Sequence, residues 1–458
     1  MGKSTGNTWK KMGDLIEDLL VKIGVPGCSV GILQDGEIKT AGFGISNIEQ
    51  VRPVSGNTLF QIGSITKTFT AVVAMKLVEQ GKLDLHRSVT AYLPEFSVVD
   101  AEVSAQVTPY HLLTHTSGWD GDLFLDTGHG IDAIQQYVSK MADRKQIFPL
   151  GKYFSYNNAG FGLLGSLLET VSEKPLEELF REFIIDPLEL PHVFFTAGEV
   201  ISHDFVVGHH KVGQEIEVAR PWDFPRFVLP MGAIVTTPSD LLEYAKCYLN
   251  HGKTPAGKQL LKPETIEAMF SARIPISKAD HTSVGLSWIR RDFDGGYLVS
   301  HGGGTNGQVS QLVLLPELNF AFTIFTNGDL GSQVIAALHE FILKEFVGVE
   351  YALPTEINST PEQLAKFIGT ASRPGFKFHL KMRGEHLIGL EECTIGFPTE
   401  KDPPPPPTPP AGVGRCAEDR LIILDGASKD VVIDIFRDAE AKINFLRMGR
   451  MYTFTPGT

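Results

Sequence analysis

Two polar residues three positions apart, Ser64 and Lys67, stand at the start of a long apolar run. Residues one helical turn apart lie on the same face of a helix and can meet. A serine hydroxyl is a poor nucleophile unless a base beside it takes its proton. A lysine amine can be that base if burial keeps it neutral. The spacing therefore predicts a nucleophile with its base, although Ser-x-x-Lys also occurs by chance in long proteins.

A second polar segment, Tyr156-x-Asn158, precedes an apolar run typical of a helix. Tyr156 is the other candidate for proton transfer, because a neighbouring lysine would stabilise its phenolate and the two groups would share one proton. We expect Tyr156 to relay that proton to the leaving group and later to activate water. Taken alone, Tyr156 would be an ordinary half-buried tyrosine.

A third polar segment, His301 to Gly304, lies between two strand-like runs. Its glycines would let a strand edge approach a substrate closely. Backbone N–H groups on such an edge can stabilise an oxyanion as it develops. A phosphate-binding loop is disfavoured, because the segment leads into a strand and not into a helix.

The elements that must position these segments form a helix-rich middle between strands. The Ser64 helix continues to Gly81, and from Ala71 to Val78 only Lys76 is charged, so we expect a buried helix. Further helices are expected at 8–23, 131–145, 161–171, 237–250, 263–270 and 332–346, and strands at 28–33, 37–43, 284–290, 297–300, 308–315 and 320–326. The predicted fold class is α+β, with one antiparallel sheet built from both ends of residues 1–351 around a helical insert.

The last hundred residues have a different pattern. Residues 352–361 form a polar, proline-containing linker, and residues 376–383 then alternate apolar and basic side chains with a period of two. Further strand-like runs predict a small β-barrel or sandwich over 362–458. The proline-rich loop 402–411 inside this unit favours a stiff spacer over a partner-binding segment.

In chain order, Ser64-x-x-Lys67, Tyr156-x-Asn158 and His301-Gly302-Gly303 resemble the motifs of the serine β-lactamase and penicillin-binding-protein superfamily. The resemblance is to its class C, D,D-peptidase and family VIII esterase branch. It extends through residues 1 to about 350 and includes residues 112–118 and 326–328. It implies a β-lactamase/transpeptidase-like fold, and the last unit is similar to the lipocalin-like domain of some peptidases and esterases of this family.

The resemblance also implies roles for the individual residues. Ser64, Lys67 and Tyr156 would be catalytic. Asn158, His301 and Gly303 would bind the substrate, with Asn158 also contacting Lys67. The backbone N–H groups of Ser64 and Gly304 would form the oxyanion hole.

The third motif departs from the family pattern at its first position, where lactamases and transpeptidases usually carry lysine and this chain has His301. Histidine offers only a conditional charge near neutral pH. It is therefore a poorer anchor for the carboxylate of a β-lactam or peptide. This departure favours the esterase or aminopeptidase side of the superfamily.

The leading hypothesis is a serine hydrolase that acts on a small ester, amide or peptide through an acyl-enzyme on Ser64. A carboxylesterase with at most weak β-lactam hydrolysis comes first. The alternatives are a D-aminopeptidase or D,D-peptidase-type amide hydrolase, a β-lactamase proper, and a non-catalytic penicillin-binding sensor. Residues 360–458 could also be a partner-docking module.

Composition excludes several other classes. With 41 basic and 54 acidic residues the formal charge is −13, which disfavours nucleic acid and anionic membranes as partners. No cofactor is expected, and no metal, since there is no C-x-x-C pair and the histidines lack ligand spacing. No apolar run could span a membrane and no signal core is visible, so we expect a cytoplasmic protein. Cys393 and Cys416 could be bridged, and nothing in the sequence specifies an oligomeric state.

Overall fold

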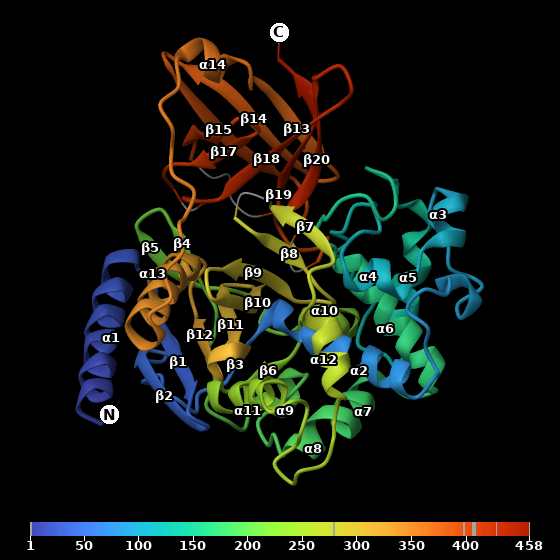
Figure 1. Cartoon of the computed structure of the whole chain (residues 1–458), viewed down its shortest axis with the longest axis vertical. Helices are drawn as coiled ribbons and strands as arrows, with labels where there is room; N and C mark the ends of the chain where they lie inside the picture. Colours follow the sequence, from blue (N-terminus) through green and yellow to red (C-terminus); the bar gives the residue numbers. More distant parts are fainter. Residues whose placement is uncertain (1, 278–279, 397–398, 405–408, 427, 458) are drawn as a thin grey trace.

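The computed structural model describes residues 2–277, 280–396, 399–404, 409–426 and 428–457. It contains a sheet surrounded by helices, followed by a closed β-barrel that lies above one edge of the helix-covered unit (Figure 1). The predicted α+β class, with a small all-β unit after it, is confirmed. The domain limits at residues 351 and 362 stay a prediction.

An eight-stranded antiparallel sheet is the scaffold of the first unit, in the order β2-β1-β12-β11-β10-β9-β8-β7. Its strands are β1 Gly27–Gln34, β2 Glu37–Gly44, β7 Ile274–Ser277, β8 Thr282–Val284, β9 Ile289–Phe293, β10 Gly296–Thr305, β11 Gln308–Leu315 and β12 Phe320–Thr326. Strands from the two ends of the unit lie side by side, because β1 pairs with β12 and Cys28 stands opposite Thr326. The prediction of a sheet built from both ends is therefore confirmed.

One strand prediction is wrong. The continuous strand expected at 284–290 is broken by a turn between β8 and β9, where Gly285 N donates to Trp288 O at 2.8 Å. Ser287 has φ +71°, a left-handed conformation that cannot continue a strand. The Trp288 side chain is fully buried, so the turn is fixed by core packing that the alternation of residue types does not reveal.

Helices cover both faces of the sheet. On one face α1 (Gly2–Ile23) and α13 (Gly331–Ile342) share a core cluster in which Met12 and Ile16 pack with Leu338. The other face is covered by α11 (Pro238–Leu249) and the helical insert. The remaining helices are α2 Thr66–Glu79, α3 Ala101–Gln106, α4 Pro109–Leu113, α5 Ala133–Ser139, α6 Asn158–Ser172, α7 Leu176–Phe180, α8 Asp186–Leu188, α9 Ala197–Val200, α10 Leu229–Gly232, α12 Pro263–Phe270 and α14 Pro361–Ala365. In the described ranges no helix combines the length and the apolar character needed to cross a membrane.

The helix that follows Ser64 is buried, as its sequence predicts. Eleven residues of α2 are buried, including Phe69, Val72 and Leu77. Both its polar and its apolar sides are enclosed, because the insert packs around it. A buried helix gives the residues at its N-terminus a fixed position and a low-dielectric surrounding.

The C-terminal unit is a closed barrel of eight antiparallel strands and not a sandwich. Its strands are β13 Gly369–Arg373, β14 Phe376–Arg383, β15 His386–Cys393, β16 Ala411–Ala417, β17 Arg420–Ile423, β18 Val432–Arg437, β19 Ile443–Met448 and β20 Arg450–Pro456. The predicted alternation in β14 holds, with Phe378 and Leu380 inside the barrel core. Cys393 and Cys416 are free thiols, so they are not bridged. Residues 405–408 of the predicted proline-rich spacer lie outside the described residues.

Candidate active site

Ser64 and Lys67 meet at the entry to α2. Ser64 lies in a short 3-10 turn, Gly63–Ile65, that leads directly into the helix. Lys67 Nζ donates hydrogen bonds to Ser64 Oγ at 3.0 Å and to Met231 O at 2.7 Å. The three-residue spacing thus places both side chains on one face, as expected.

The surroundings of Lys67 favour its neutral amine. The side chain is fully buried. Burial and the charge of Arg450 lower the pKa of Lys67 well below its ordinary value, against the opposing influence of Asp122. A neutral amine beside a serine hydroxyl can accept its proton.

Tyr156 approaches the same point from the segment before α6. Lys67 Nζ lies 5.0 Å from the centre of its ring. The Tyr156 hydroxyl is buried and has no hydrogen-bond partner among the described residues. Burial raises the pKa of Tyr156, although Ser64 and Arg450 act in the opposite direction. Burial therefore works against the phenolate expected from the sequence and favours a protonated tyrosine beside a neutral Lys67.

Asn158, the first residue of α6, lies beside this pair in the same cavity. Its Nδ2 donates to Asp122 Oδ1 at 2.9 Å. The amide therefore bonds the carboxylate and not Lys67, which the resemblance had implied as its contact. The preceding residue, Asn157, caps α6 by accepting from Gly160 N at 2.7 Å, which fixes where the helix begins.

The glycine run of the third motif is the open half of strand β10. Strand β9 pairs only with residues 296–300 of β10, so residues 301–305 leave one edge free to face Ser64. An added Cβ at Gly303 would lie 1.9 Å from Ile62 O, and one at Gly63 would lie 2.7 Å from Gly304 N. Only glycines allow this approach, and it brings the Gly304 N–H next to the turn that carries Ser64.

His301 is buried and electrically neutral. Its Nδ1 lies 2.7 Å from Gly302 O, so Nδ1 carries the proton and donates. Burial and the nearby Lys67 lower the pKa of His301 to about 3. The conditional charge expected near neutral pH is therefore absent, because the group titrates far below that range.

The barrel contributes to the site through the β19–β20 hairpin. Gly449 O accepts from Tyr156 N at 2.9 Å, and Ser155 Oγ accepts from Met451 N at 3.0 Å. Arg450 lies over the Tyr156 ring, 5.2 Å from its centre. No pattern in the sequence indicated this contribution, since the hairpin is remote in the chain from every motif.

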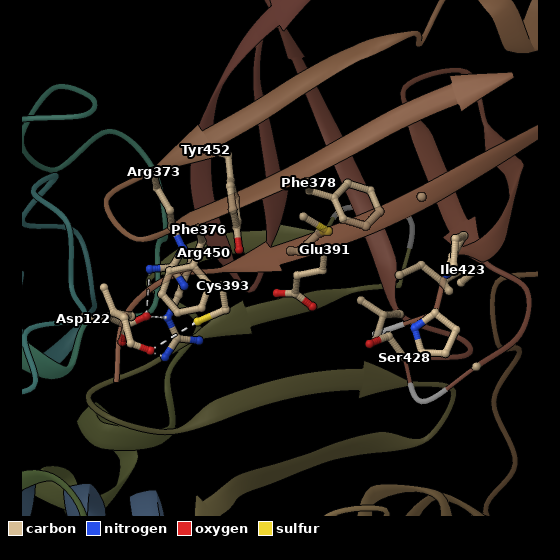
Figure 2. A pocket seen from close by; sticks show the side chains of 18 of the residues that line it. Asp122, Arg373, Phe376, Phe378, Glu391, Cys393, Ile423, Ser428, Arg450 and Tyr452 are labelled. Carbon is tan, nitrogen blue, oxygen red and sulfur yellow. Dashed lines mark hydrogen bonds and ion pairs between the residues drawn. The ribbon is translucent and has the colours of Figure 1, made fainter. Parts of the chain in front are cut away.

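A buried charge cluster joins the barrel to the rest of the molecule (Figure 2). Asp122 Oδ1 accepts a hydrogen bond from Arg450 Nη2 at 3.0 Å, and Asp122 Oδ2 forms ion pairs with Arg450 Nε at 2.5 Å and with Arg373 Nη1 at 2.9 Å. Burial alone would raise the pKa of Asp122, but Arg450 and Arg373 outweigh it and lower that pKa. Burial and the charge of Asp122 raise the pKa of Asp120 to about 6. These residues follow the polar turn at 114–119, but the two arginines that pair with them, Arg373 and Arg450, come from the folded barrel.

His115 is a further residue that the sequence had not singled out as functional. Its ring stacks on Tyr156 with 4.5 Å between centres, and its Nδ1 accepts from Asn157 N at 3.0 Å. Burial, followed by Lys67, lowers the pKa of His115 well below its ordinary value. It therefore acts as a neutral wall that orients Tyr156. The sequence signal that could have identified His115 is its position within residues 112–118, which are part of the family resemblance.

Around these groups lies a cavity of about 580 Å³. Many of its lining side chains are apolar, and most of the polar ones are those already described. Gly449 and Arg450 line it on the barrel side. The full lining consists of Ser64, Phe124, Phe154, Tyr156, Asn158, Phe224, Phe227, Val228, Met231, Gly232, Ile276, Thr282, Ile289, His301, Gly302, Gly303, Gly304, Thr305, Gly449 and Arg450. Within the described part of the chain, no group of three or more His, Cys, Asp or Glu side chains could hold a metal ion. The cavity therefore presents a serine, a phenol and backbone N–H groups, and the buried Lys67 amine contacts that serine.

Known proteins resemble this chain in sequence and in fold. Penicillin-binding protein 4 of Amycolatopsis lactamdurans is 31% identical over 360 residues, which are 77% of this chain and 94% of that protein. The crystal structure of SurE superposes with a TM-score of 0.75 at 22% identity, covering 98% of this chain and all of that one, and its structure with D-Leu gives 0.72 at 21% with the same coverage. EstCE1, a hydrolase with promiscuous acyltransferase activity, gives 0.61 at 20% identity over 70% of this chain and 94% of that one. At these identities the solved structures show a shared fold, and SurE shares both units.

The family assignment rests on most of the chain. Residues 12–344 match the model of the Beta-lactamase family, a range that contains every motif discussed above. The relative with 31% identity is matched over nearly its whole length. The chain belongs to the beta-lactamase family of serine hydrolases.

Proposed function

We propose that this protein is a carboxylesterase that forms an acyl-enzyme on Ser64 and hydrolyses β-lactams weakly at most. The observation that carries the proposal is the 3.0 Å hydrogen bond between Ser64 Oγ and Lys67 Nζ, with that amine fully buried. Burial supplies the neutral base that a serine nucleophile needs.

In the proposed reaction Lys67 Nζ takes the proton of Ser64 as Oγ attacks the ester carbonyl. The negative charge that develops on the carbonyl oxygen is received by the backbone N–H groups of Ser64 and Gly304. The leaving alcoholate takes the proton of the Tyr156 hydroxyl, and Lys67 returns its proton to Tyr156. Water then attacks the acyl carbonyl, and the proton transfers run in reverse. Tyr156 takes a proton from the water after passing its own to Lys67, and Lys67 protonates Ser64 Oγ as the acid leaves.

The charge distribution supports neutral esters over β-lactams. His301, which stands where relatives with lactamase motifs carry lysine, is neutral at physiological pH because its pKa lies at about 3. The positive charge of Arg450 is paired with Asp122. No unpaired cation of the described cavity lining would thus hold a substrate carboxylate. We assign Asn158, His301 and Gly303 to the walls that contact the acyl group.

The test is covalent labelling. Intact mass spectrometry after p-nitrophenyl acetate or a fluorophosphonate probe should reveal one adduct on the wild type and none on Ser64→Ala. Turnover of p-nitrophenyl acetate should disappear in the same variant. An unlabelled wild type, or a Ser64→Ala variant that retains turnover, would overturn the proposal and favour a non-catalytic binding protein.

A second candidate, hydrolysis of D-amino-acid amides or peptides, is favoured by the hairpin residues Gly449 and Arg450 that close the cavity. SurE, which shares both units, has been solved with D-Leu. A panel of p-nitrophenyl esters, D- and L-amino-acid amides and nitrocefin separates the candidates. A kcat/KM for D-amides above that for esters would favour the second one.

A further inference from the structure

A second cavity, of about 520 Å³, lies at the mouth of the barrel. Aromatic and aliphatic side chains form much of its wall, among them Phe376, Phe378 and Met448. It adjoins the Ser64 cavity, because Phe124 and Arg450 line both. The two cavities are therefore neighbours, and Arg450 forms part of the wall of each.

Glu391 is a carboxylate at an inward position of the barrel wall. Side chains of a strand alternate between its two faces, and the inward residues of β15 before it are the buried Leu387 and Gly389. Glu391 stands directly opposite Phe378 of β14. Figure 2 shows its carboxylate projecting into the cavity. A charged residue in this register interrupts an apolar wall.

The neighbouring residue shows what an outward glutamate does in the same strand. Glu392 points away from the cavity and pairs with Lys377 at 3.6 Å and with His379 at 3.3 Å. Among the residues that the structure describes, the Glu391 side chain has no hydrogen-bond or ion-pair partner. The two carboxylates therefore differ in partners although they are adjacent.

The other charges of the barrel mouth are already matched. Arg373 and Arg450 both bond Asp122, and Arg373 Nη1 also lies 3.4 Å from Asp120 Oδ1. Asp120 also faces Arg144, so three carboxylates and three guanidinium groups share this region, and among the described residues Glu391 is the carboxylate without a direct partner. Glu391 is half-buried and lies in a largely apolar wall without a direct partner, so this cavity suits a ligand that brings a cation.

We propose that the barrel cavity binds an apolar chain ending in a single amine, with the ammonium group on Glu391 and the chain against Phe376, Phe378 and Met448. This amine-bearing chain is the distal end of a substrate whose ester carbonyl lies at Ser64. The placement of that carbonyl rests on the proposed hydrolase function, whereas amine binding in the barrel does not.

Binding is tested by isothermal titration calorimetry on the full chain with 4-phenylbutylamine and 4-phenylbutanol. The amine should bind about tenfold more tightly than the alcohol, because it adds one charge-assisted hydrogen bond. Glu391→Gln should remove that preference, and the control Glu392→Gln should keep it. Equal binding of the two probes by the wild type, binding of neither, or an unchanged preference in Glu391→Gln would overturn the proposal. The wild-type comparison holds whether or not a variant folds.

Kinetics identify the source of the amine. The KM of p-nitrophenyl 8-aminooctanoate should lie about tenfold below that of the octanoate, and Glu391→Gln should equalise the two without changing turnover of the acetate. Equal KM values in the wild type, with tight binding of the free amine, would overturn the substrate source and assign the cavity to a separate ligand. Failure of the hydrolase function would appear as absent acetate turnover, and the calorimetry would be unaffected.

Discussion

The Ser64 cavity and the barrel cavity are similar in volume, at about 580 and about 520 Å³, but they treat buried titratable groups in opposite ways. Around Ser64, burial lowers the pKa of both Lys67 and His301, so the groups are neutral. In the barrel mouth, Asp122 and its two arginines stay ionised because they pair. A buried titratable group thus either loses its charge or pairs with a group of opposite charge.

The difference follows from what each region does. A general base must be able to take up a proton, so the active site needs an amine that is uncharged at rest. The barrel must dock on the first unit in one orientation, and directional ion pairs fix an orientation better than apolar contact does. Arg450 belongs to both regions, since it pairs with Asp122 and also lowers the pKa of Lys67.

The largest effect should come from removing the neutral amine. We expect Lys67→Met to lower kcat/KM for p-nitrophenyl acetate by about 10⁴-fold, at the upper end for loss of a general base. The fold should persist, because an apolar side chain replaces an uncharged buried one. Steady-state kinetics with thermal unfolding check both points.

The matched control is Lys82→Ala, at an exposed lysine just after the same helix, which should keep wild-type turnover. A folded Lys67→Met variant with turnover within tenfold of the wild type would contradict the role of a neutral base. The pH profile adds a second check: activity should persist well below the ordinary pKa of lysine, since the neutral form is already present there.

Breaking the paired charges should mainly affect stability. Asp122→Asn leaves Arg450 buried without a carboxylate partner, and we expect a loss of about 3–5 kcal/mol in the free energy of unfolding. Turnover should also fall, because Asp122 holds Asn158 and Arg450. Urea unfolding followed by fluorescence measures the first effect, and ester kinetics the second.

An exposed ion pair of the barrel provides the comparison. Asp419→Asn removes the partner of Arg437, two side chains that remain 46% and 32% exposed, and should cost less than about 1 kcal/mol. Equal losses for the two variants would mean that the buried cluster does not hold the units together.

Three local motifs made the polar lining of the Ser64 cavity predictable. Ser64 with Lys67, Tyr156 with Asn158, and the glycine run after His301 are each defined by spacing over a few residues, and the fold brings them to one cavity. The sheet was also predictable, because alternation and turns are local signals.

The missed features depend on contacts between distant parts of the chain. Arg450 and Asp122 have no local pattern and gain their meaning when the barrel docks. The neutral state of His301 depends on its burial, which its neighbours in the sequence do not reveal.

Two glycines test how rigid the walls of the two cavities are. A Cβ at Gly303 would lie 1.9 Å from the backbone oxygen of Ile62, whereas one at Gly389 would lie 2.3 Å from the tip of the Phe378 ring. Backbone cannot give way as a ring can, so we expect Gly303→Ala to cost about 3 kcal/mol and Gly389→Ala about 1 kcal/mol. Urea unfolding of both variants is the measurement, and the reverse order would show that the site wall is the softer one.

A neutral, partly buried histidine outside both cavities gives the smallest effect. Burial and Arg291 lower the pKa of His339 to about 4, against about 6.5 in an unfolded chain. Between these values the unfolded chain binds a proton that the folded chain does not, so stability falls as the pH falls through this window. Between pH 7 and pH 5 the free energy of unfolding of His339→Gln should therefore fall by about 1 kcal/mol less than that of the wild type. The difference is small because the ring is partly exposed. The control is His386→Gln at an exposed residue of the barrel, which should keep the wild-type dependence of the free energy of unfolding on pH. If His339→Gln also keeps that dependence, the neutral state of His339 does not contribute to it.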